Sequence, residues 1–83
     1  MTEITERAAR AARLRADDAF QEFMDAVRQK QVARFLSLSA TAEDREEAHA
    51  MVRALAAIEG ELASAIGAAA VEQKRKGQHR GDD

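Results

Sequence analysis

The chain has 83 residues, of which 46% are hydrophobic, 34% are charged and 20 are alanine, and its formal net charge is −2. It contains no proline, cysteine, tryptophan or tyrosine, which excludes disulfide frameworks, thiolate zinc sites and cysteine nucleophiles. Alanine and unbranched charged residues favour helices, whereas the β-branched and aromatic residues typical of strands are scarce. We therefore predict an all-α fold.

The first predicted segment is helical over residues 3–37. Within it, Asp17-Asp18-Ala19-Phe20-Gln21 is typical of a new helix start, with Asp18 as the N-cap and Gln21 reaching back to the backbone. The sequence therefore leaves open a break near residues 16–18. In that case a short leading helix over residues 3–16 precedes the main helix over 18–37.

The second predicted helix runs over residues 42–76 and follows the hydroxyl-rich stretch 37–41. Thr41 is its predicted N-cap, and Asp44 completes an approximate capping box. No helix breaker follows until Gly77, so we expect residues 77–83 to form a polar, mobile tail. These elements predict that residues 1–76 form one unit, a two-helix antiparallel hairpin.

The second helix carries two apolar faces. One is a heptad-like seam for packing on another helix: Ala48, Met51, Leu55, Ile58, Leu62, Ala65 and Ala69, flanked by Val52 and Ile66. The other contains only small residues, which would allow close approach of a second helix: Ala56, Gly60, Ala63, Gly67 and Ala70. A hairpin supplies only one neighbour, so we expect the other to come from another chain. The residues predicted to mediate self-association are Met51, Leu55, Ile58, Leu62, Ile66, Gly60 and Gly67.

Oligomerisation is also expected because the chain is too short to bury all of its large apolar side chains by itself. Apart from Met1, the chain has 17 large apolar side chains, and a lone hairpin cannot bury all of them. Without disulfides, the remaining aids to stability are a second copy, a partner surface or a metal. We therefore expect the hairpin to oligomerise or to dock on a larger assembly.

Charge is distributed unevenly along the chain. Residues 1–16 carry a net charge of +2, and residues 17–47 carry −4. Such asymmetry favours complementary subunit contacts, although solvated faces and phosphate binding remain alternatives. The residues predicted to contact a partner or phosphate are Arg7, Arg10, Arg13, Lys74, Arg75 and Lys76.

The sequence contains little that indicates chemistry. Glu46 and His49 have the spacing used by carboxylate-bridged metal sites, and Glu22 could supply a third ligand, so a metal-storing protein is a rival hypothesis. Both Glu46 and His49 point away from the predicted seam, however. Because no catalytic set or phosphate-binding loop is found, we predict no enzymatic activity, no cofactor and no metal.

We expect no membrane segment and no secretion signal. The least polar stretch, Ala54–Val71, contains Glu59 and Glu61 and is mostly alanine, so we predict that it is too polar to span a membrane. The first residues have neither a basic nor an apolar signal region. These features predict a cytoplasmic location or incorporation into a particle assembled there.

Three stretches together carry a resemblance to a known family: residues 13–23, 44–49 and 55–62. They resemble small helical-hairpin proteins of the head-morphogenesis region of tailed bacteriophages, in which an Asp-x-x-Phe-Gln-Glu-like start opens the first long helix. The resemblance implies a non-enzymatic structural or assembly subunit associated with the capsid, portal or connector. It also implies location in the host cytoplasm during assembly and then in the virion. The alternative is a DNA-packaging or DNA-binding adaptor that uses the basic ends of the chain.

Overall fold

The structure, a computed structural model, describes the backbone of residues 3–81 and the side chains of residues 3–76. It contains three helices in this range, α1 (Glu3–Ala16), α2 (Asp18–Leu36) and α3 (Ala42–Gly81). The predicted all-α fold is confirmed. The first segment, whose continuity the sequence left open, is divided into two helices.

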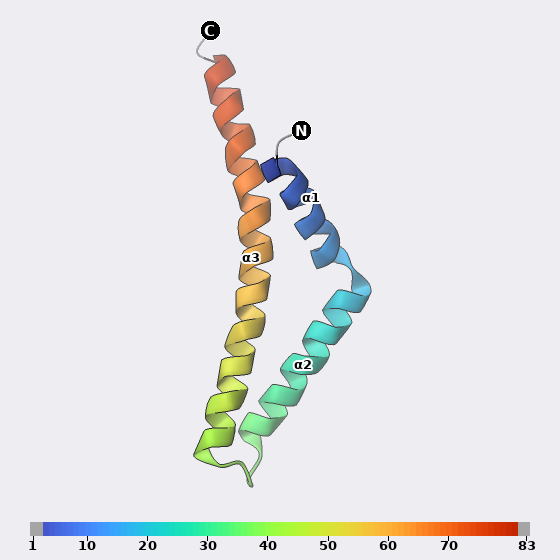
Figure 1. The fold of residues 1–83 in the computed structure, drawn as a ribbon, viewed down its shortest axis with the longest axis vertical. Coiled ribbons are helices and arrows are strands. Elements are labelled where there is room, and N and C mark those ends of the chain that lie inside the picture. Colours follow the sequence, from blue (N-terminus) through green and yellow to red (C-terminus); the bar gives the residue numbers. More distant parts are fainter. Residues whose placement is uncertain (1–2, 82–83) are drawn as a thin grey trace.

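The long helix α3 supports both shorter helices (Figure 1). From the loop at residues 37–41, α2 runs back along the first half of α3, and α1 packs against a later part of it. The shorter helices contact α3 far more than each other. The last turns of α3 project beyond the N-terminal end of α1 (Figure 1).

Asp17 separates α1 from α2. Its extended backbone and its Oδ1, which accepts a hydrogen bond from the Phe20 amide at 2.9 Å, make it the N-cap of α2. The predicted cap, Asp18, is wrong by one residue, because the amide bonded to a cap lies three residues later. Gln21 does reach back, as predicted, but its Nε2 donates to the Arg15 carbonyl oxygen at 2.8 Å.

Thr41 and Asp44 form the predicted capping box at the start of α3. The Asp44 amide donates to Thr41 Oγ1, and the Thr41 amide donates to Asp44 Oδ2, each at 3.0 Å. These hydrogen bonds with Thr41, together with the nearby Arg34 guanidinium, hold the pKa of Asp44 below its ordinary value. The capping box predicted from the sequence is therefore confirmed, with Thr41 and Asp44 each in the predicted role.

The predicted end of this helix at residue 76 is wrong, because α3 continues to Gly81. A glycine within a helix costs only about 1 kcal/mol relative to alanine, and no glycine among the described residues has a positive φ. Gly77 therefore weakens the helix without terminating it. Apart from the backbone of residues 77–81, the predicted polar tail lies outside the described residues.

The core of the molecule is thin. Among the described side chains, five hydrophobic residues are buried: Ala8, Ala11, Met24, Ala48 and Leu55. The molecule measures 66 × 24 × 16 Å, and its radius of gyration is 18.5 Å, whereas a compact domain of this length has about 12 Å. Small buried residues on α1 let it approach α3 closely, but much apolar surface stays exposed.

Candidate interaction surfaces

The line of α3 that faces the shorter helices is shifted from the predicted seam. Its most covered residues are Ala48, Val52, Leu55, Leu62, Ala65, Ile66 and Ala69. Met51 and Ile58, expected within the seam, are 44% and 45% exposed, whereas Ala65 of the seam is partly covered beside α1. Where α2 packs, the intramolecular contact therefore uses the flank of Val52 more than that of Met51.

Glu59 lies between Leu55 and Leu62 in the pattern of this line, at the edge of the contact with α2. Its side chain is 47% exposed, and its Oε1 accepts a hydrogen bond from Arg28 on α2. The second guanidinium nitrogen of Arg28 donates to Asp25 at 2.8 Å. Because Arg28 neutralises the glutamate, α2 can pack on this flank of α3.

The predicted self-association residues thus fall into three groups. Leu55 is buried by the chain itself, and Leu62 and Ile66 are partly covered. Met51 and Ile58 are available on one flank of α3. Gly60 and Gly67 are exposed, and a Cβ added at either would have no neighbour within 4 Å. Self-association through any of these residues stays a prediction.

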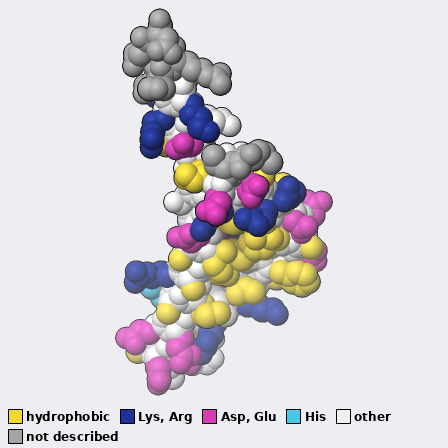
Figure 2. All heavy atoms as spheres, turned by 45° about the horizontal axis from the view of Figure 1, so that its top comes forward, with side chains coloured by type: hydrophobic (Ala, Val, Ile, Leu, Met, Phe, Trp, Pro, Cys, Tyr) yellow, Lys and Arg dark blue, Asp and Glu magenta, His cyan; other side chains and the backbone are white. Residues whose placement is uncertain are grey.

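Exposed hydrophobic residues from all three helices share the flank of Met51, and we call this set the apolar face. Its exposed members are Ile4, Leu14, Phe23, Met51 and Ile58. Figure 2 shows hydrophobic side chains gathered between α3 and the shorter helices, with acidic side chains clustered at the end that carries the 37–41 loop.

Two interhelical ion pairs establish that these residues lie on one side. Residues eleven apart on an α-helix point within about 20° of the same direction, which places Phe23 with Arg34 on α2 and Ile58 with Glu47 on α3. Arg34 donates to Glu47 at 2.7 Å, so these two directions converge on the same flank.

The second ion pair extends the apolar face to α1. Arg7 donates to Glu61 at 3.3 Å, and a shallow groove of about 240 Å³ beside this pair is lined by Leu14 of α1 and by Leu62 and Ala65 of α3. Glu61 lies two heptads after Glu47 and therefore on the same flank of α3. The members of the apolar face therefore lie on one flank, from Ile4 and Leu14 on α1 through Phe23 on α2 to Met51 and Ile58 on α3.

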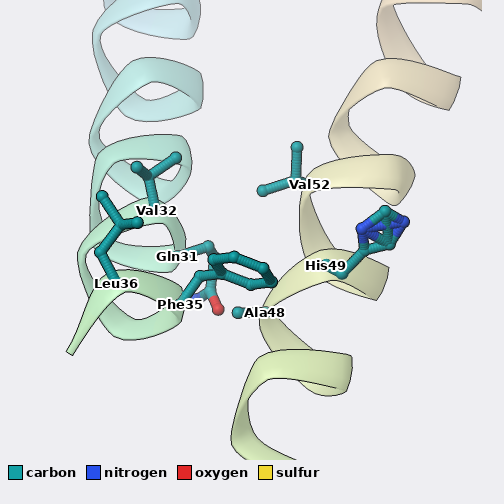
Figure 3. A pocket seen from close by; sticks show the side chains of 7 residues that line it. All are labelled: Gln31, Val32, Phe35, Leu36, Ala48, His49 and Val52. Carbon is teal, nitrogen blue, oxygen red and sulfur yellow. The ribbon is translucent and has the colours of Figure 1, made fainter. Parts of the chain in front are cut away.

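A second, smaller groove lies on the opposite flank (Figure 3). It has a volume of about 210 Å³, and its lining residues are Gln31, Val32, Phe35, Leu36, Ala48, His49 and Val52. Phe35 points from α2 toward Ala48, whereas the His49 ring points away from α2 (Figure 3). Among the described residues, the buried Oε1 atom of Gln31 has no hydrogen-bond partner. The groove is apolar and contains no set of groups that could carry chemistry.

The two basic segments lie toward the same end of the molecule. Because the N-terminal part of α1 packs near residues 61–68 of α3, residues 74–76 follow within about three turns. Residues 3–16 and 61–76 contain seven basic and four acidic side chains, whereas residues 17–60 contain five basic and nine acidic ones. Arg10 and Arg13 are exposed, as are the basic residues at 74–76. The molecule therefore has a basic end and an acidic end.

The rival metal site is not assembled in the part of the chain that the structure describes. No group of three histidine, aspartate or glutamate side chains in that range is close enough to hold a metal ion. Glu22, Glu46 and His49 are all exposed. Their spacing in the sequence therefore does not bring three ligands together.

By length and composition alone, one helix qualifies as a membrane span. The segment Ala42–Lys76 contains a window with a mean hydropathy of 1.5, although Glu59 and Glu61 lie in this part of α3. Core helices of soluble proteins and signal sequences meet the same criterion, so one such helix is weak evidence for a membrane span, and only 6% of this window is buried inside the molecule. The expectation that this stretch is too polar to span a membrane stays a prediction.

No family model, no curated protein and no solved structure matches this chain.

Proposed function

We propose that this chain is a non-enzymatic structural or assembly subunit, a helical hairpin that self-associates or docks on a larger shell. One observation carries the proposal. The chain exposes 6565 Å² of accessible surface, whereas a compact monomer of 9.1 kDa exposes about 4,900 Å². The surplus of about 1,700 Å² is twice the area that one partner contributes to an interface of standard size.

The setting that we propose is the particle of a tailed bacteriophage. The pattern of residues 13–62 supports it through the resemblance described above. The partners would be further copies of this chain and a larger capsid, portal or connector protein. The subunit would be present in the host cytoplasm during assembly and then in the virion.

Sedimentation of the purified chain at micromolar concentration tests self-association. We expect a dimer or a larger species, because the apolar surface of a single copy is incompletely covered. A well-folded monomer with a cooperative thermal transition would refute the proposal. The phage setting is tested separately by the genes that flank this one and by mass spectrometry of purified particles, which should contain the chain at a fixed stoichiometry.

A DNA-packaging or DNA-binding adaptor is the second candidate, and the proximity of the two basic segments favours it. Binding through phosphate contacts would weaken steeply as salt increases. Retention of duplex DNA at low salt, lost when Arg10 and Arg13 are changed to glutamine, would support this alternative. Retention that is independent of both arginines would contradict it.

A further inference from the structure

We infer that the apolar face binds a second copy of this chain in antiparallel orientation, with the two-fold axis near Ile58. The inference rests on the proposed self-association and adds the surface and the geometry. Three observations support it: exposed hydrophobic residues at the centre of the face, the distribution of charge along α3, and the surplus of accessible surface.

The hydrophobic residues of the face lie on both sides of its middle, with Leu14 beside Leu62 and Met51 one heptad before Ile58. Ile58 lies near the centre of the α3 segment 42–76, and Phe23 of α2 lies about 8 Å along α2 from Arg28, which bonds to Glu59. A two-fold axis there would bring Ile58 close to its own mate and would include both copies of Phe23 in the interface. Phe23 is 68% exposed, and aromatic residues at the centre of an interface contribute strongly to binding.

The charge of α3 favours the antiparallel arrangement. Residues 42–49 contain four acidic side chains and one basic side chain, whereas residues 72–76 contain three basic and one acidic. An antiparallel pair centred on Ile58 places the acidic end of one α3 beside the basic end of the other. A parallel pair would bring like charges together at both ends, which is unfavourable.

The surplus of accessible surface favours a second copy of the chain over a small ligand as the occupant of the apolar face. Each partner of a standard interface buries about 800 Å², and the surplus surface of this chain is larger than that. The face is elongated and formed by three helices, so an equally long helical surface matches it. A two-fold contact supplies such a surface without requiring another protein.

Because the chain contains no cysteine, single introduced cysteines can test this geometry. A disulfide requires Cα atoms within about 7 Å. Ile58→Cys lies at the proposed axis, so mild oxidation should give a disulfide-linked dimer. Ala68→Cys lies on the same flank about 15 Å further along the helix, and its mates would be about 30 Å apart. Ala63→Cys lies on the side of the small-residue strip. We expect neither control to cross-link.

The outcomes distinguish this inference from the proposed function. Cross-linking at both Ile58→Cys and Ala68→Cys would indicate a parallel pair and overturn the inference. Cross-linking at Ala63→Cys alone would move the interface to the small-residue strip, overturning the inference while leaving self-association intact. A folded monomer in sedimentation would overturn both.

A matched pair of substitutions on α2 provides a second test. Phe23 and Leu36 are equally exposed, at 68% and 70%, but only Phe23 belongs to the apolar face. We expect Phe23→Ser to weaken dimerisation about 30-fold, with helicity unchanged, as for a central interface residue. Leu36→Ser should leave the dimerisation constant within about threefold. Equal effects of the two substitutions would overturn the inference.

Discussion

Leu55 should contribute more to stability than any other large side chain on α3. It is 7% exposed and lies at the middle of the covered line, between α3 and the shorter helices. Leu55→Ala removes three carbon atoms, which corresponds to about 2.4 kcal/mol of lost burial at about 0.8 kcal/mol per carbon. The cavity contribution should be small, because the thin core lets neighbouring side chains and water approach. We therefore expect a loss of about 2–3 kcal/mol, toward the lower end of values for buried leucines.

Urea unfolding followed by circular dichroism measures this loss, provided that both proteins are compared at the same chain concentration. Ala57→Glu is the control, because Ala57 is exposed on the side of α3 away from the covered line, and it should change stability by less than about 0.5 kcal/mol. If Leu55→Ala cost less than about 1 kcal/mol, or if Ala57→Glu were equally damaging, our assignment of the covered side of α3 would be refuted.

Four further predictions concern substitutions elsewhere in the chain. Thr41→Ala should cost about 0.5–2 kcal/mol in unfolding experiments, because it removes the cap of α3. Hydrogen bonds lower the pKa of Asp44 in the folded chain. The ionised carboxylate therefore stabilises the fold fully above the ordinary pKa of about 3.9, and this stabilisation is lost as pH falls through the pKa of the folded chain. The stability difference between wild type and Asp44→Asn should therefore shrink below about pH 4. Gly60→Ala and Gly67→Ala should each raise the free energy of unfolding by about 0.8–1 kcal/mol, because an added Cβ has no neighbouring atom within 4 Å. If Gly60→Leu or Gly67→Leu reduced self-association instead, the small-residue face of α3 would be an interface. Gln31→Leu should stabilise the chain by about 1–2 kcal/mol in thermal unfolding, because it removes a buried acceptor that has no partner among the described residues.

Local signals in the sequence predicted the helices well. The break near residues 16–18 and the capping box at Thr41 depend on side chains that bond to backbone only three residues away, so sequence spacing determines them. The end of α3 was not predictable in the same way. Gly77 carries a small energetic cost for helix, and no positive φ or proline makes that cost decisive.

The side of α3 that is covered was harder to predict, because it depends on a residue of another helix. Apolar spacing selects Met51 and Ile58 over Glu59, since a glutamate in a seam is unfavourable when it is considered alone. Arg28 changes that balance by pairing with Glu59 across the interface. Once α2 uses that flank, Met51 and Ile58 stay 44% and 45% exposed.

This displacement connects the packing of the chain to its proposed role. If α2 packed over Met51 and Ile58, Glu59 would lose its Arg28 partner and α3 would retain little apolar surface for a second copy. With the Arg28–Glu59 pair formed, a charged contact joins the helices on one flank, and Met51 and Ile58 stay partly exposed on the other. The Arg28–Glu59 pair thus favours coverage of the Val52 flank and leaves Met51 and Ile58 for the proposed self-association, the role that the sequence predicts for both.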